Sequence, residues 1–223
     1  MFCAACSARR PEVIPSVVSV VCGRSLSTVS SSAGGPLSRL CSILITLLPA
    51  TADTLEAELG RDLTALARCL EVIVDEWPPI DGEWDVGAMR FFRNRVDDPS
   101  LDPRFGPSYV TIDGALVGHA GFFGAPDEGG EVEIGYSVCE SHRRRGVATA
   151  VIAELCRQAA DLECSSVRAR VQSNNLGSIG ALQRNGFAAI DHSPENDEEE
   201  LLLRRSLNDE CADSCGRPGG GDQ

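Results

Sequence analysis

Lysine is missing from this chain: all 20 basic residues are arginine. Without lysine, the chain has neither a phosphate loop of the Walker type, which needs Gly-Lys-Ser/Thr, nor any chemistry through a lysine Schiff base. The sequence therefore excludes two common ways of handling nucleoside triphosphates and carbonyl substrates.

Long apolar runs and a positive net charge are also lacking. No hydrophobic stretch reaches the roughly 18–20 residues that a membrane-spanning helix needs, so we expect no membrane partner. The net charge of −13 argues against nucleic acid as the main partner, because binding phosphates needs a basic face. The 43% of hydrophobic and 24% of charged residues are typical of a soluble globular protein.

The ten cysteines do not have the spacing of a disulfide framework. Two close pairs, Cys3/Cys6 and Cys211/Cys215, lie in the terminal segments, and no histidine is near them. We therefore predict no metal site and reduced thiols in a cytosolic or organellar compartment.

Residues 1–40 are rich in serine, arginine and small residues and are poor in acids. This composition predicts a disordered extension that serves as a transit peptide to a plastid or mitochondrion. An inert tail, a mis-assigned start and a short secretory core at Val13–Cys22 remain alternatives. Residues 41–207 form the expected domain, and 208–223 read as a disordered tail in a cytoplasmic or organellar protein.

The first half of the domain shows the 3.6-residue period of helices. A strand at 40–48 precedes a capping-box pattern, Asp53 with Glu56, which predicts a helix from about Thr54 to Pro78. A second helix is expected over 85–95.

From Ser108 the period changes to two, which predicts a hairpin with its turn at Asp113-Gly114 and a further strand at 131–138. The remaining expected elements are helices at 149–162 and 177–184 and strands at 167–171, 187–191 and 200–207.

The segment 143–148, Arg-Arg-Arg-Gly-Val-Ala, joins the strand at 131–138 to the following helix. A strand–turn–helix connection aims several backbone N–H groups and the positive end of a helix at one point. Gly146 permits close approach of a ligand to the backbone. The segment favours a phosphate-bearing ligand, with a plain basic turn as the alternative.

Two motifs in order resemble the GNAT superfamily of acyl-CoA-dependent N-acetyltransferases. Arg143-x-x-Gly146-x-Ala148 matches its pyrophosphate loop, and Asn175-x-x-Ser178 followed by Asn185-Gly186-Phe187 resembles its second block. The stretch 121–136 and Trp77-Pro78-Pro79 are similar to the ribosomal-protein N-alanine acetyltransferase branch. The resemblance implies an α+β fold with a mixed, mostly antiparallel sheet flanked by helices and opened after its fourth strand.

The resemblance also implies a site for acetyl-CoA and no metal. The pantetheine arm would pair with backbone near Val138 and Cys139, and a backbone N–H near Val138 would meet the thioester oxygen. Asn175 and Ser178 would hold the cofactor arm, with Asn175 as an ordinary helix cap as the alternative. The pyrophosphate would lie on the N–H groups of Arg143, Arg144, Arg145, Gly146, Val147, Ala148 and Thr149.

For catalysis, the resemblance makes Glu133 the candidate general base, with Glu131 in reserve; the alternative is an outward-facing strand glutamate or a structural hydrogen-bond acceptor. Many family members carry a tyrosine as general acid where this chain has Leu182. Here either Ser178, the nearest donor in sequence, protonates the leaving thiolate, or the thiolate leaves without a proton donor.

Three other residues near these motifs receive lesser roles. We expect His119 to be a packed strand residue and His142 to lie beside the cofactor loop. Cys139 would be an acylated nucleophile only if transfer were not direct.

The sequence thus predicts an enzyme that transfers acetyl from acetyl-CoA to a primary amine by direct attack. The acceptor would be a small molecule or a protein N-terminus, and the protein a monomer or homodimer. A non-catalytic acyl-CoA-binding regulatory module is the alternative, and the leucine at 182 is its main support.

Overall fold

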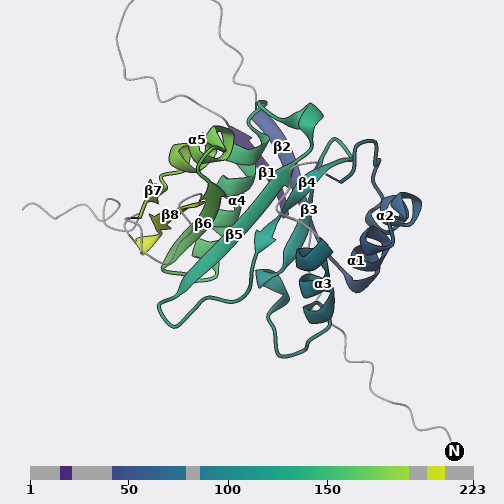
Figure 1. The fold of residues 1–223 in the computed structure, drawn as a ribbon, viewed down its shortest axis with the longest axis horizontal. Coiled ribbons are helices and arrows are strands. Elements are labelled where there is room, and N and C mark those ends of the chain that lie inside the picture. The colour runs from purple at the N-terminus through teal and green to yellow at the C-terminus, as the bar shows by residue number, and fades with distance from the viewer. Residues whose placement is uncertain (1–15, 22–41, 79–85, 191–199, 209–223) are drawn as a thin grey trace, which may run out of the picture.

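The computed structural model describes residues 16–21, 42–78, 86–190 and 200–208 of the 223-residue chain (Figure 1). The strands are β1 (Ser16–Val21), β2 (Ser42–Pro49), β3 (Pro107–Ile112), β4 (Ala115–Phe122), β5 (Glu131–Val138), β6 (Ser166–Gln172), β7 (Ala188–Ala189) and β8 (Glu200–Ser206). The helices are α1 (Ala52–Leu59), α2 (Leu63–Leu70), α3 (Val86–Arg95), α4 (Val147–Asp161) and α5 (Leu176–Arg184), with short 3-10 turns η1 (Pro103–Phe105) and η2 (Glu140–His142).

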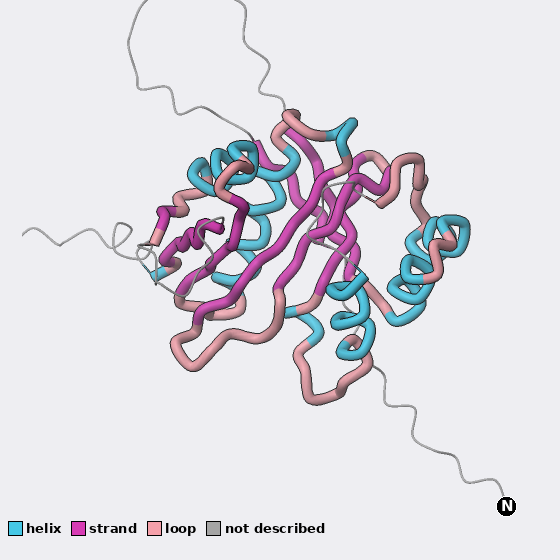
Figure 2. Tube along the Cα trace, viewed as in Figure 1, coloured by secondary structure: helices cyan, strands magenta, loops and turns pink. Residues whose placement is uncertain are grey.

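One eight-stranded sheet organises the molecule, in the order β1-β2-β3-β4-β5-β6-β8-β7. Every neighbouring pair is antiparallel except β5 and β6, which run parallel. In Figure 2 the strands are magenta and the helices that flank them are cyan. A parallel pair needs a crossover, and α4 supplies it between β5 and β6. The predicted α+β fold with a mixed, mostly antiparallel sheet is therefore confirmed.

The two faces of the sheet carry different helices. Ala120 and Phe122 of β4 join a large apolar core together with Val151 and Leu155 of α4. On the other face, Tyr109 of β3 and Leu116 of β4 pack with Leu66 of α2. Neighbouring residues of a strand face opposite sides, and the register shift opposite Val110 and Thr111 reverses this alternation in β4, so Leu116 and Ala120 belong to different cores.

The helix expected from Thr54 to Pro78 is instead two helices, and this expectation was wrong. Thr51, not Asp53, is the cap of α1: its hydroxyl accepts from Thr54 N–H, and the Thr54 hydroxyl accepts from Thr51 N–H. The chain breaks at Gly60–Asp62, and Asp62 then caps α2. After Leu70 the chain leaves the helix, because Glu71 adopts a left-handed conformation (φ 56°).

The other predicted elements lie close to their expected bounds. α4 begins at Val147, two residues before the predicted start, because Gly146 (φ 89°) already ends the preceding loop. α5 begins at Leu176, after its cap Asn175. The strand expected at 187–191 forms only at Ala188–Ala189 as β7, and residue 191 lies outside the described part of the chain.

Part of the predicted N-terminal extension belongs to the sheet. Ser16–Val21 pairs antiparallel with Ser42–Leu47 of β2 and forms an edge strand. The expectation of an extension outside the domain therefore does not hold for these six residues. The rest of residues 1–40, and the tail from 209, lie outside the described residues.

Among the helices that the structure describes, none has the length and apolar character needed to cross a membrane.

Candidate active site

Strands β5 and β6 stay together over only three residues. Their pairing runs from Glu131–Ser166 to Glu133–Arg168, whereas β5 remains paired with β4 as far as Val138. The second half of β5 therefore has a strand neighbour on its β4 side, while the β5–β6 ladder has already ended.

The backbone groups along this open edge follow from the alternation of a β-strand. Cys139 N–H donates to Val117 O of β4, and Phe123 N–H donates to Glu133 O. Odd-numbered residues of β5 thus turn their backbone groups to β4, so Tyr136 and Val138 turn theirs to the open edge. An extended ligand at this edge would pair with Tyr136 and Val138.

Cys139, the other residue expected at this position, has both backbone groups used within the protein. Its N–H donates to Val117 O and its carbonyl accepts from His142 N–H. Its thiol donates to Glu76 O at 3.1 Å. Burial, with the nearby charge of Glu76 second, raises the pKa of the Cys139 thiol to about 11.

The loop after β5 opens onto the start of α4. Arg144 (φ 60°) and Gly146 (φ 89°) are both left-handed, and no side chain caps the helix. Ala150 N–H is the first to bond back into the helix, to Gly146 O. The N–H groups of Val147, Ala148 and Thr149 precede this bond and point out of the helix, which is the arrangement that binds an anion.

The three arginines of this loop have different surroundings. Arg143 turns inward, and its Nε donates to Val138 O at 2.9 Å, so it closes the end of the open edge. Arg144 and Arg145 are exposed. Two guanidinium groups therefore lie in solvent beside the uncapped helix start.

Glu76 holds the base of this loop, a role that the sequence did not reveal. Its carboxylate accepts from Glu140 N–H at 2.8 Å, from Ser141 N–H at 3.2 Å and from the Ser141 hydroxyl. The hydrogen bond from Ser141 is the main cause that lowers the pKa of Glu76. The Ser141 hydroxyl in turn lies 2.8 Å from Nδ1 of His142.

The second motif block lies on α5, next to the start of α4. Asn175 is the helix cap, since its side-chain oxygen accepts from Ser178 N–H at 3.1 Å. Asn185 donates to Thr149 O of α4 at 3.2 Å and to Ala181 O at 2.9 Å. The asparagine of the Asn-Gly turn thus ties the two helices together, which the sequence pattern did not indicate.

Leu182 and Ser178 lie differently on α5. Leu182 is fully buried in the core with α4, whereas Ser178 is half-buried. The phenol of Tyr136 reaches across from β5 and lies 3.4 Å from Ser178 O. A strand residue therefore brings a phenol to α5, where the helix itself has a leucine.

Glu133 and Glu131 belong to a charged cluster where β5 meets β6. Glu133 pairs with Arg168 Nε at 2.9 Å and with Arg170 Nε at 3.2 Å. Glu131 pairs with Arg204 Nε at 2.6 Å and also contacts Arg168. The cluster joins β5, β6 and β8 next to the point where the pairing of β5 with β6 ends. These contacts fit the alternative in which Glu133 is a structural hydrogen-bond acceptor. Its role as base stays a prediction.

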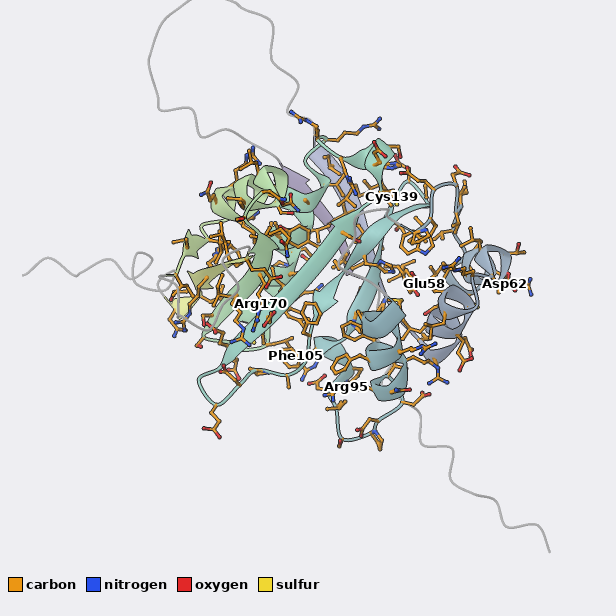
Figure 3. All side chains as sticks on the ribbon, in the orientation of Figure 1. Glu58, Asp62, Arg95, Phe105, Cys139 and Arg170 are labelled. Atoms are coloured by element: carbon orange, nitrogen blue, oxygen red, sulfur yellow. The ribbon has the colours of Figure 1, made fainter. Side chains whose placement is uncertain are left out.

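A buried carboxylate, which the sequence analysis did not single out, lies on the α1 side of the sheet (Figure 3). The Glu58 side chain is 8% exposed and accepts from Tyr109 Oη at 2.8 Å and from Trp77 Nε1 at 3.1 Å. His119 Nε2 lies 3.1 Å from both carboxylate oxygens. Burial, and next the charge of Glu58, raises the pKa of Tyr109.

The prediction that His119 is a packed residue is confirmed, since its side chain is 2% exposed. It packs against Trp77 at 4.4 Å and Tyr109 at 5.2 Å between ring centroids. Its contact with a carboxylate was not foreseen, because Glu58 is 61 residues away along the chain. Among the described residues, no cluster of three His, Cys, Asp or Glu side chains could hold a metal ion.

Comparison with known proteins gives one family. The sequence profile described as "Acetyltransferase (GNAT) family" matches residues 66–187. A curated relative, the uncharacterized N-acetyltransferase YjdG of Bacillus subtilis (strain 168), is 40% identical over 81 residues. That match covers 36% of this chain and 48% of the relative, so the chain spans about half the length of this protein.

Solved structures share the fold at low sequence identity. Mycobacterium smegmatis RimJ in complex with CoA-disulfide has a TM-score of 0.50 and 20% identity, over 74% of this chain and 83% of that one. A putative ribosomal-protein-serine acetyltransferase from Vibrio cholerae has a TM-score of 0.50 and 15% identity, over 73% and 93%.

Proposed function

The chain belongs to the acetyltransferase (GNAT) family, and from this premise we propose that it transfers the acetyl group of acetyl-CoA to a primary amine. The observation that carries the proposal is the open edge of β5, followed at once by the loop 143–146 and the uncapped start of α4. An extended amide chain fits the first feature and a pyrophosphate the second.

The end of β5 and the start of α4 bind different parts of the cofactor in this proposal. Tyr136 and Val138 offer backbone groups to the pantetheine arm, and Val138 N–H is the donor for the thioester oxygen, where negative charge develops during acyl transfer. The N–H groups of Val147, Ala148 and Thr149 bind the pyrophosphate, with Arg144 and Arg145 supplying positive charge. The predicted contacts of Arg143, Gly146, Asn175 and Ser178 remain part of the proposal, whereas Cys139 is left out because its N–H and its carbonyl both bond within the protein.

The raised pKa and the burial of the Cys139 thiol favour direct attack by the amine. A thiol with a pKa of about 11 is protonated at neutral pH, and the thiolate is the nucleophile in acyl-cysteine chemistry. Cys139 is also 1% exposed. We therefore propose a single transfer step without an acyl-cysteine intermediate.

The acid–base groups of this step are also proposed. Glu133 is one candidate for the general base, the one that the family resemblance suggests, and it would have to release an arginine contact before it could accept a proton. Ser178 is the proposed donor to the leaving thiolate.

For the acceptor, we propose a small-molecule amine or a protein N-terminus. One structural neighbour is described as a putative ribosomal-protein-serine acetyltransferase, which supports a protein N-terminus as one class to test. We further propose that the protein is a monomer or homodimer and acts in the cytoplasm, or in an organelle if residues 1–40 include a transit peptide.

The experiment is release of CoA thiol from acetyl-CoA over a panel of small amines and N-terminal peptides, with CoA affinity measured by calorimetry. We expect micromolar CoA binding and turnover of at least one acceptor, in the range of ordinary enzymes. Absence of CoA binding would refute the proposal.

A second candidate, a non-catalytic acyl-CoA-binding module, rests on the buried leucine at 182. Tight CoA binding without turnover of any amine would favour that module over the enzyme.

A further inference from the structure

The α1 side of the sheet carries a row of polar side chains that ends at the open edge. Tyr109 of β3 pairs in register with His119 of β4, and His119 pairs with Ser137 of β5. Residues directly opposite each other on antiparallel strands project to the same face, with Cβ atoms about 4.5–5.5 Å apart. Ser137 thus connects the Glu58 cluster, which consists of Glu58, Trp77, Tyr109 and His119, to the part of β5 that lies beyond its pairing with β6.

Ser137 is a buried polar residue, and its hydroxyl makes no hydrogen bond to the described residues. The residue is 8% exposed, and its Oγ has no hydrogen-bond partner within the described part of the chain. A buried hydroxyl left unsatisfied costs free energy, and such groups point to a ligand, a water or a catalytic role. Its place between Tyr136 and Val138, whose backbone groups face the open edge, puts this hydroxyl beside the proposed thioester position.

The chemistry of the neighbouring cluster suits a proton acceptor. The Glu58 carboxylate only accepts hydrogen bonds, so the proton in its contact with His119 belongs to Nε2 of the imidazole. The carboxylate therefore stabilises positive charge on the ring, as in other carboxylate–histidine pairs. Tyr109 of β3 and Trp77 of the segment after α2 keep the carboxylate in place.

Glu133 stands apart from this row, although it projects to the same face of β5. Four residues of strand separate it from Ser137, which corresponds to about 13 Å. Between them lies Gly135, over which the ring of Phe123 packs so closely that an added Cβ would be 2.7 Å from it. Glu133 and the Glu58 cluster are therefore two separate charged groups on one face.

We propose that Ser137 and the Glu58–His119 pair receive the acceptor amine. Ser137 Oγ accepts a hydrogen bond from the ammonium group, and the buried pair takes one of its protons. The nitrogen lone pair then forms a bond to the acetyl carbonyl carbon while the carbon–sulfur bond breaks and its electron pair leaves on CoA sulfur. The second nitrogen proton neutralises the thiolate, and the first returns to solvent. This inference rests on the proposed acetyl transfer.

The test compares two acceptors of similar shape: an alkylamine, which is an ammonium ion at neutral pH, and its alkoxyamine analogue, which is already neutral. Glu58→Gln removes the charge and keeps the size of the side chain. We expect kcat/KM for the alkylamine to fall about 100-fold or more, the usual contribution of a general base, and that for the alkoxyamine to change by less than about threefold. Glu56→Gln, an exposed glutamate on the same helix, is the control and should leave both values unchanged.

Ser137→Ala is a second variant that tests the inference even if Glu58→Gln does not fold. It removes a hydroxyl that forms no hydrogen bond within the described part of the chain. Its thermal stability should equal or exceed that of the wild type, while KM for the alkylamine rises about tenfold through the lost bond to a charged group. Equal losses on both acceptors in Glu58→Gln, or unchanged kinetics in Ser137→Ala, would overturn the inference.

The two proposals fail in different ways. If the wild type binds CoA and turns over neither these two acceptors nor any amine of the panel, acetyl transfer to amines is refuted. The amine site is then tested by calorimetric titration of the alkylamine into the CoA-bound protein. Binding that is lost in Glu58→Gln and kept in Glu56→Gln would still support the site. No binding to the wild type would overturn it.

Discussion

At the scale of single residues, two carboxylates on one face of the sheet have opposite surroundings. Glu133 contacts two guanidinium groups and its side chain is 19% exposed. Glu58 is nearly buried and contacts a phenol, an indole and an imidazole, none of which carries a permanent charge. The first environment stabilises a fixed negative charge, and the second suits a carboxylate that exchanges protons through its neighbour.

Glu133→Gln separates the structural and catalytic roles of this residue. Since the ion pairs are partly exposed, we expect a loss of about 1 kcal/mol in the free energy of unfolding, measured by urea denaturation. With Glu58 and His119 intact, the ratio of alkylamine to alkoxyamine turnover should stay unchanged. Glu128→Gln, in the exposed turn before β5, is the matched control. A selective loss of alkylamine turnover would instead make Glu133 the base.

At the scale of elements, the crossover from β5 to α4 carries the proposed cofactor site. Arg143 closes the end of the strand, Gly146 starts the helix, and Asn185 joins the first turn of α4 to α5. Each contact fixes where the N–H groups at the start of α4 point. The loop is thus held from the strand, from the Glu76 segment and from the neighbouring helix.

Gly146→Ala tests this crossover. At φ 89° an added Cβ crowds the backbone, so we expect a loss of about 1–2 kcal/mol in the free energy of unfolding and weaker CoA binding, because the N–H groups shift. Gly180→Ala inside α5 is the control: its Cβ would make only ordinary contacts, so it should stabilise the helix by about 0.5–1 kcal/mol. Unchanged CoA affinity in Gly146→Ala would show that this loop does not bind the pyrophosphate.

At the scale of the whole molecule, the sheet extends beyond the region that the family profile matches. The profile covers residues 66–187, whereas β1 and β2 at one edge and β8 and β7 at the other complete the sheet. α4 contacts β1 and β2 as well as β5 and β6. The helix that carries the proposed pyrophosphate site therefore packs against the strand pairs on either side of β3 and β4.

Removal of β1 tests the contribution of this edge. A chain that begins at residue 22 exposes the backbone of β2, and we expect a lower melting temperature and concentration-dependent association through the new edge, seen by size-exclusion chromatography. A chain that begins at Ser16 keeps β1 and serves as the control. Equal stability and a monomeric state in both chains would mean that β1 adds nothing to the sheet.

Local patterns were sufficient for most of the fold. The hairpin at Asp113-Gly114, the strand at 131–138 and the helix after Gly146 depend on turn residues and periodicity, which act over a few neighbours. The helix expected through Pro78 failed because the apolar period continues across Gly60–Asp62, whereas α1 ends at Gly60, Asp62 starts α2 and the left-handed Glu71 ends it. The edge strand β1 was missed because its partner β2 lies beyond a 20-residue connection.

The sequence by itself determined the family resemblance, the order of strands and helices around the loop 143–148, and the exclusion of lysine chemistry. Only the tertiary structure decided which charged groups meet: Glu58 with His119, Glu133 with Arg168 and Arg170, and Glu76 with the turn at Ser141. Motifs describe residues within one segment, whereas these contacts join segments about 35 to 65 residues apart along the chain. Sheet register brings Glu133 to Arg168, and the packing of α1 and of the segment after α2 against the sheet brings Glu58 and Glu76 to their partners.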